Sequence, residues 1–152
     1  MLLLIDATSH LPLTAEGAPL LFPELPAGIE VTTRVQITPE VTAARLRSAS
    51  AADLAPRTGH ARSHADNYLV SRAVGLLAAR ERYAFDPADG SPLTWGESGI
   101  VARGASGTPI FPRIDPCVIG VVEHAAGDRI LLGENRRRPG FFTCIAGYMD
   151  VG

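Results

Sequence analysis

The sequence contains no lysine, because all 14 of its basic residues are arginine. This absence excludes mechanisms that need a catalytic lysine, such as a Schiff base or a P-loop. Cysteine is scarce as well, since Cys117 and Cys144 are the only two. Two cysteines cannot build a disulfide scaffold or a four-cysteine zinc site.

Long apolar runs are also missing. The four apolar residues after Met1 are followed at once by Asp6 and have no basic leader, so we expect no signal peptide. No segment approaches the roughly 18 apolar residues of a membrane span. We therefore expect a soluble protein of a reducing compartment, the cytoplasm.

Neither sign of charge is in excess, since 14 basic and 16 acidic residues give a net charge of −2. A general binder of nucleic acids or membrane surfaces would carry a basic excess, so the balance argues against both classes. The 152 residues, of which 46% are hydrophobic and 20% charged, can form one ordinary domain or two small ones.

Prolines divide the first 56 residues into short pieces. From Ile29 to Ile37 apolar and polar residues alternate, which predicts a strand with one buried face. Thr38-Pro39-Glu40 is typical of a helix start, so we predict a short helix that ends at about Arg47. We find no catalytic constellation in this part.

Residues 66–83 have apolar positions on one side of a predicted helix. Turn-forming residues follow at 86–90, 96–99 and 104–107, with the spacing of two short hairpins. Hairpins this short bury little apolar area, so they need either a cross-link or packing against a neighbouring element to be stable.

Three strands are predicted in the last part. The apolar run 117–122 is typical of a strand buried on both faces, and 129–133 returns after a turn at 126–128 to complete a hairpin. Residues 141–146 form a third strand, and no helix pattern follows it. One face of this sheet would stay uncovered, and the whole pattern is α+β.

Three segments in the last 42 residues read FPRIDPCVI (111–119), GDRILLG (127–133) and FTCIAGYMDVG (142–152). In order and spacing they resemble the NADH pyrophosphatase branch of the Nudix hydrolases. The resemblance implies an N-terminal mixed α/β domain at 1–65, and a linking helix with a zinc-ribbon-like segment at 66–110. It places the opening strands of a Nudix α/β/α sandwich at 111–152.

The ribbon-like segment departs from the family, whose ribbon usually carries C-x-x-C pairs. In the family the zinc ligands lie in two turns, called knuckles, which would be residues 83–90 and about 104–107 here. Asp86 and Asp89 in the first knuckle keep a ligand-like spacing, but the second knuckle offers only Ser106. Two carboxylates are a poor zinc site without nitrogen or sulfur partners. We therefore favour a metal-free, hydrogen-bonded ribbon over a loose cation site on the two aspartates.

The Nudix box reads G-x(5)-E-x(7)-R-E-U-x-E-E-x-G-U in the family, where U is a bulky aliphatic residue. Gly147 would be its opening glycine, and the sequence stops one residue before the first glutamate. In the family these glutamates hold Mg²⁺ or Mn²⁺, which generates the attacking hydroxide. We expect no catalytic residue in this chain and no activity of the chain alone, and a glutamate-rich helix in the reading frame after Gly152 would settle the function of the parent protein.

The resemblance implies peripheral roles for three residues. The backbone carbonyl of Ala146 would contribute to the metal site, and Gly147 and Tyr148 would contact the substrate, with the Tyr148 ring stacking on a base. The alternatives are an ordinary strand end at Ala146 and a turn aromatic that covers the sheet at Tyr148.

Two other groups of residues can be interpreted either as structural or as functional. Arg136-Arg137-Arg138 has the chemistry of a phosphate or RNA site, but we favour a solvated loop because no wider basic surface accompanies it. His60 and His64 have a spacing that could bind metal on a helix, but no acid or cysteine completes that site.

The cysteines lie in apolar strands, so we interpret Cys117 and Cys144 as buried small hydrophobic residues. The prolines of the 112–116 turn set the entry to a strand, and we predict that Asp115 accepts a nearby backbone N–H.

The resemblance implies a hydrolase that cleaves the diphosphate of NADH or NAD, including an NAD cap on RNA, and that forms a homodimer. The alternative is a non-catalytic dimerisation or regulatory module. A Rossmann dinucleotide binder is excluded, because no helix pattern follows the glycine-containing turn at 104–107.

Overall fold

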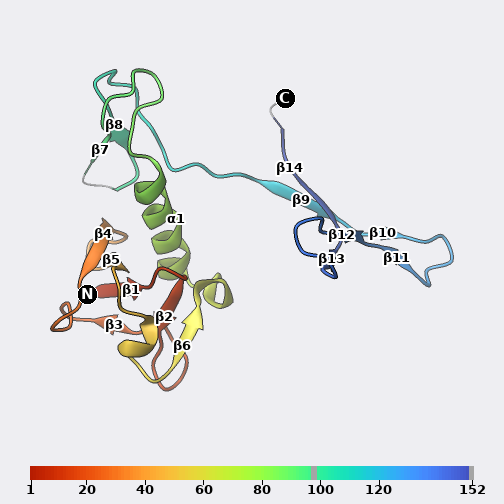
Figure 1. Cartoon of the computed structure of the whole chain (residues 1–152), viewed down its shortest axis with the longest axis horizontal. Helices are drawn as coiled ribbons and strands as arrows, with labels where there is room; N and C mark the ends of the chain where they lie inside the picture. The colour runs from red at the N-terminus through yellow and green to blue at the C-terminus, as the bar shows by residue number, and fades with distance from the viewer. Residues whose placement is uncertain (97–98, 151–152) are drawn as a thin grey trace. The chain divides into compact units, whose positions relative to one another are not determined.

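Figure 1 shows the computed structural model, which describes residues 1–96 and 99–150. The chain divides into two compact units, Met1–Pro112 and Arg113–Gly152. The described residues form a single α-helix and several small sheets, which confirms the predicted α+β class. In the same residues no helix is long and apolar enough to cross a membrane. The finer three-part division stays a prediction.

A four-stranded sheet forms the centre of the first unit (Figure 1). In spatial order its strands are β3 (Leu21–Phe22), β1 (Leu2–Ile5), β5 (Thr42–Leu46) and β4 (Val31–Gln36). The central pair β1 and β5 is parallel, and both outer pairs are antiparallel. The predicted strand at 29–37 is thereby confirmed as β4.

The first strand is buried on both faces. Leu3 and Ile5 belong to the main core cluster, whereas Leu4 belongs to a second cluster with Ala44 and Leu46. Because neighbouring side chains of a strand point to opposite faces, a run of consecutive apolar residues suits a central strand. The apolar opening of the sequence is therefore part of the core.

The helix α1 (Tyr68–Arg82) packs on β4 and β5 and confirms the helix predicted at 66–83. Asn67 caps it, because its Oδ1 accepts the N–H groups of Leu69 and Val70 at 3.0 and 3.2 Å. Four residues of its buried side join the main core: Val70, Ala73, Leu76 and Leu77.

The helix predicted from Thr38 to about Arg47 is wrong. The Thr38 Oγ1 atom accepts the N–H groups of Glu40 and Val41, which makes a turn and not a helix start. The chain then continues as β5, whose central place in the sheet buries Ala43 and Ala44 on opposite faces. Tertiary pairing with β1 and β4 overrides the helix propensity of the alanines.

A second ladder pairs β2 (His10–Pro12) with β6 (Thr58–His60). Two 3-10 helices flank β6, η1 (Ala51–Asp53) before it and η2 (Ala61–His64) after it. We did not predict these elements, which are all too short to show a periodic pattern.

The hairpins predicted after α1 are present. The strands β7 (Thr94–Trp95) and β8 (Ala102–Arg103) are antiparallel, and part of their predicted turn, residues 97–98, lies outside the described residues. The guanidinium of Arg80 lies 4.7 Å from the centre of the Trp95 ring, and Ile100 packs on the main core. These contacts are the packing on a neighbour that short hairpins need.

Within residues 113–150 the second unit forms three two-stranded ladders. They pair β9 (Cys117–Gly120) with β14 (Ile145–Tyr148), β10 (Val122–Glu123) with β11 (Ile130–Leu131), and β12 (Gly133–Glu134) with β13 (Phe142–Thr143). The ladder of β10 and β11 confirms the predicted hairpin only beside its turn, because β9 pairs with β14 and not with 129–133 as we predicted. The predicted third strand is present but divides into β13 and β14.

The burial that we predicted for residues 117–122 is wrong. Val118 and Ile119 are 59% and 67% exposed, and the other apolar residues of this segment are exposed too. The reason is that no second layer covers these ladders within the part of the chain that the structure describes.

Candidate functional site

The three residues that the resemblance points to lie together on β14. The N–H of Met149 donates to the carbonyl of Pro116 at 2.9 Å, and Gly147 lies opposite Val118. Because hydrogen-bonded and non-hydrogen-bonded pairs alternate along an antiparallel ladder, Ala146 and Ile119 form a non-hydrogen-bonded pair. The Ala146 carbonyl therefore points away from β9, toward the other edge of β14.

Tyr148 ends this strand and is 80% exposed, so its ring does not cover the sheet. It borders a pocket of about 480 Å³ whose other lining residues are Arg113, Ile114, Asp115, Pro116 and Met149. An exposed ring at the mouth of a pocket can stack on a planar group. The last two positions of the resemblance, Val151 and Gly152, lie outside the described residues.

These residues do not make a metal site by themselves. A carbonyl oxygen is a suitable ligand for Mg²⁺ or Mn²⁺, but a divalent ion needs several such donors. Among residues 1–96 and 99–150, no group of three or more His, Cys, Asp or Glu side chains could hold a metal ion. The Ala146 carbonyl is thus one donor position and not a complete site.

The two cysteines are not buried as we predicted. Cys117 is exposed and Cys144 is half-buried, and both are free thiols. Cys117 lies in β9, and Cys144 lies between β13 and β14. Both segments are apolar in sequence, but no layer covers these ladders in the part of the chain that the structure describes, so apolar neighbours in the sequence do not produce burial here.

The turn before β9 also differs from the prediction. Asp115 forms an ion pair with the guanidinium of Arg113, in place of the backbone N–H that we expected. Both side chains are largely exposed, so this pair adds little stability.

Hydrogen bonds connect the two knuckles of the ribbon-like segment. Asp86 is only 1% exposed, and its carboxylate accepts the Ser106 hydroxyl at 2.6 Å and the Ala88 N–H at 2.8 Å. Asp89 accepts the hydroxyl and the N–H of Ser91, and these bonds lower the pKa of Asp89. The Ser91 hydroxyl in turn accepts the N–H of Ala105 at 2.7 Å. Polar side chains thus connect the positions that face one another across the ribbon.

The remaining candidates have ordinary structural partners. His60 accepts the N–H of Arg62 through Nδ1 at 3.1 Å and contacts the ring of His10 edge to face at 5.1 Å. Arg136, Arg137 and Arg138 are exposed in the loop between β12 and β13, as in the solvated-loop interpretation.

The structure also contains a pocket that the sequence does not predict. It lies beside α1 in the first unit, and its polar lining residues come from elements that are far apart in the chain. No local motif signals it, because only the fold brings these residues together.

No family model matches the chain. Curated relatives do, and they are NAD-capped RNA hydrolases, which confirms the resemblance to the NADH pyrophosphatase branch of the Nudix hydrolases. The particular relatives include NAD-capped RNA hydrolase NUDT12 of Macaca fascicularis, 37% identical over 95 residues, and that of Homo sapiens, 36% identical over 95 residues. NAD-capped RNA hydrolase NudC of Mycobacterium tuberculosis is 35% identical over 86 residues.

Each of these matches covers 55% of this chain. The chain spans only 20% of the length of the two NUDT12 proteins and 27% of the mycobacterial protein. The similarity therefore supports a hydrolase by resemblance, and the activity of the whole protein is a proposal.

Proposed function

We propose that this chain is part of a Nudix hydrolase that cleaves the diphosphate of NAD(H), both as the free dinucleotide and as the cap of an RNA. The observation that carries the proposal is its similarity to NAD-capped RNA hydrolases. In the reaction, the oxygen of a water molecule bonds to one phosphorus atom, the bond from that phosphorus to the bridging oxygen breaks, and the water gives up a proton. The free dinucleotide then yields two mononucleotides, and a capped RNA yields one mononucleotide and an RNA with a 5′-monophosphate.

The residues of β14 have positioning and binding roles in this proposal. The exposed ring of Tyr148 would stack on a base of the dinucleotide, and the outward carbonyl of Ala146 would be one donor to Mg²⁺ or Mn²⁺. Gly147 has no neighbouring atom within 4 Å of the place where a Cβ would stand, which leaves room for a ligand beside the strand. Because no group of three or more His, Cys, Asp or Glu side chains in the described residues could hold a metal ion, the proposal takes the remaining ligands from the family's box glutamates.

The test uses the whole protein of which residues 1–152 are part. With Mg²⁺ or Mn²⁺ we expect it to convert NADH to two mononucleotides, and NAD-capped RNA to one mononucleotide and a 5′-monophosphorylated RNA, detected by chromatography. Tyr148→Ala should raise KM about tenfold, because stacking on a base contributes roughly 1–3 kcal/mol. Tyr148→Phe keeps the ring and should match the unchanged protein.

The polypeptide of residues 1–152 is the control in the same assay, and we expect no turnover from it. Robust turnover by residues 1–152 would contradict the assignment of the chemistry to residues outside them. Equal KM values for the unchanged protein and Tyr148→Ala would contradict stacking.

A second candidate function is a non-catalytic dimerisation or regulatory module. It is favoured by the exposed apolar residues of the second unit, among them Ile119, Val122, Leu131 and Phe142. The same residues support a homodimer of the hydrolase, and the free cysteines suit a reducing compartment such as the cytoplasm. We expect light scattering to give the mass of a dimer, and a monomer at micromolar concentration would contradict both proposals.

A further inference from the structure

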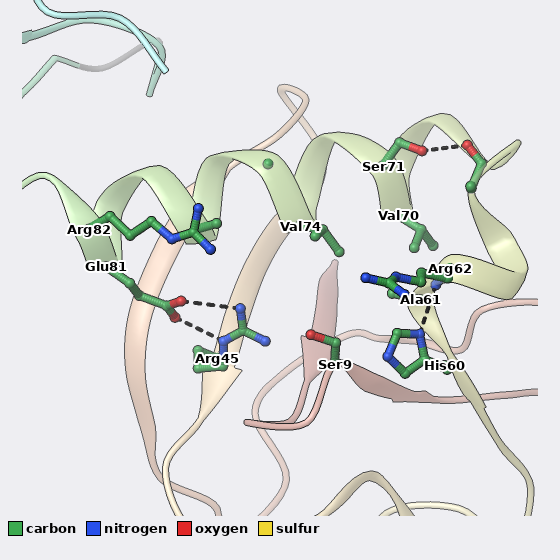
Figure 2. Close-up of a pocket in the computed structure, with 13 residues that line it drawn as sticks. Ser9, Arg45, His60, Ala61, Arg62, Val70, Ser71, Val74, Glu81 and Arg82 are labelled. Carbon is green, nitrogen blue, oxygen red and sulfur yellow. Dashed lines mark hydrogen bonds and ion pairs between the residues drawn. The ribbon is translucent and has the colours of Figure 1, made fainter. Parts of the chain in front are cut away.

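A pocket of about 610 Å³ lies between α1, η2 and the turn before β2 (Figure 2). This volume is in the range of small-molecule sites, roughly 300–1,000 Å³. Its polar lining residues are Ser9, Arg45, His60, Arg62, Ser71, Glu81 and Arg82. Three of these seven residues are arginines.

One wall of the pocket is a narrow apolar face of α1. The small side chains of Val74 and Ala78 line it one turn apart on the helix, and Arg82 lies a further turn along. Gly75 lies beside them and has no atom within 4 Å of its Cβ position. Val74, Gly75 and Ala78 have small side chains or none, so this part of the helix leaves room for a ligand.

The opposite side contains a residue in an uncommon conformation. Ser9 has a φ of +66° and is the one non-glycine residue with positive φ in the described part of the chain. The carbonyl of Ser9 accepts the N–H of Ala61 at 2.8 Å, and the N–H of Ser9 donates to Asp6. These bonds hold the turn, and Figure 2 shows the Ser9 hydroxyl directed toward the pocket. Strain at a non-glycine residue is often found at ligand sites.

The side chains that line the pocket carry a net positive charge. Arg45 pairs with Glu81 through two contacts of 2.8 and 3.2 Å, so this pair is neutral. Arg62 and Arg82 have no carboxylate partner among the residues that the structure describes, and their guanidinium groups approach the pocket from opposite ends of α1 (Figure 2). Two positive charges therefore remain.

Neutral donors accompany these charges. His60 accepts the N–H of Arg62 through Nδ1, so a neutral His60 ring carries its proton on Nε2 and can donate there. The Ser9 hydroxyl can donate as well. Two guanidinium forks, an imidazole N–H and a hydroxyl around one cavity are the donor set that binds phosphate oxygens.

We propose that this pocket binds a nucleotide phosphate, with the phosphate between Arg62 and Arg82 and the nucleoside against the apolar wall of α1. The site uses none of the residues of β14 and goes beyond the proposed hydrolysis. The phosphate is the shared chemistry of two sources, a free mononucleotide and the backbone of an RNA strand.

The experiment titrates the polypeptide of residues 1–152 with AMP, with inorganic phosphate, and with a short 5′-phosphorylated oligoribonucleotide in a phosphate-free buffer of low salt. Calorimetry measures Kd, and amide shifts of Ser9, Arg62 and Gly75 in two-dimensional NMR locate the ligand. We expect binding in the micromolar to millimolar range, with these three amides among the most shifted. Binding of AMP identifies a mononucleotide site, and binding of the oligonucleotide alone identifies a strand site.

Three variants test whether the ligand binds in this pocket. Arg62→Ala combined with Arg82→Ala should weaken binding at least tenfold, because each removes a charge-assisted hydrogen bond. Gly75→Leu fills the pocket without changing the charge and should weaken binding by a similar factor. Arg34→Ala removes the same charge from an exposed position on β4 and should leave Kd within about twofold.

Circular dichroism confirms that each variant is folded before its Kd is compared. The proposal is overturned if neither AMP nor the oligonucleotide binds at about 10 mM, a limit that corresponds to less than 3 kcal/mol. It is also overturned if Arg34→Ala weakens binding as much as the double variant, or if Gly75→Leu and the double variant bind like the unchanged chain.

Discussion

Replacing Asp6 with alanine is expected to lower the free energy of unfolding of the first unit by about 3 kcal/mol or more. Asp6 is 5% exposed, and its Oδ1 accepts the N–H groups of Thr8 and His10 and the Thr8 hydroxyl, all at 2.8–2.9 Å. Its Oδ2 accepts the buried N–H of Ala51 at 3.0 Å. Alanine would leave these donors without an acceptor, which costs more than the bonds themselves contribute.

Urea unfolding, followed by circular dichroism, measures this loss. Asp6→Asn is the matched variant, because its single carbonyl oxygen can serve Thr8 and His10 while its NH₂ group faces the N–H of Ala51. We expect a smaller but clear loss of stability for Asp6→Asn. Equal stability of all three proteins would show that the Asp6 network does not hold this turn.

The same network gives a pH dependence. Burial acts to raise the pKa of Asp6, but hydrogen bonds from Ala51, His10 and Thr8 outweigh it and hold the pKa below the ordinary 3.8. Because the pKa is lower in the folded state, this stabilisation is fully present above the unfolded pKa and is lost as pH falls through the folded pKa. Asp6→Asn should therefore reduce the loss of stability between neutral pH and about pH 3.

Gly104→Ala is expected to destabilise the ribbon-like segment by about 2–3 kcal/mol. A Cβ at position 104 would lie 2.6 Å from the Asp86 Cβ, 2.7 Å from its Oδ2 and 2.4 Å from the Ser91 Oγ. The substitution must push these groups apart, and the hydrogen bond between Asp86 and Ser106 would be lost with them.

The single tryptophan makes this prediction easy to measure. Trp95 lies in β7 and contacts Arg80, so its fluorescence reports whether the hairpin stays on α1. Gly75→Ala is the control, since its new methyl group meets nothing within 4 Å and should stabilise α1 by about 0.5–1 kcal/mol. A Gly104→Ala variant as stable as the unchanged chain would contradict the close packing of the knuckles.

The sequence predicted correctly those helices, strands and turns that are specified by a pattern of nearby residues. The alternation in β4, the apolar side of α1 and the turns of the ribbon were all visible in the sequence, because each is a repeat or a dipeptide signal within a few residues. The strand β5 was mistaken for a helix, since its alanines favour a helix and only its neighbours β1 and β4 make it a strand.

The sequence predicted the candidate residues of β14 but not the pocket beside α1. Ala146, Gly147 and Tyr148 are consecutive, so a resemblance of a short segment was enough to find them. Ser9, Arg62 and Arg82 lie in different elements, and nothing in their local sequence connects them. Burial in the second unit was wrong for a related reason, because an apolar strand is buried only when another layer covers it.

The parallel pairing at the centre of the first unit affects the order in which the chain can fold. Leu2 pairs with Thr42, 40 residues later in the chain, and the amino group of Met1 donates to the carbonyl of Glu40 at 2.8 Å. During synthesis the first strand leaves the ribosome long before its partner exists. Its apolar residues must therefore stay in contact with the ribosome exit, a chaperone or solvent until β5 has emerged, so collapse of this unit is non-local and late.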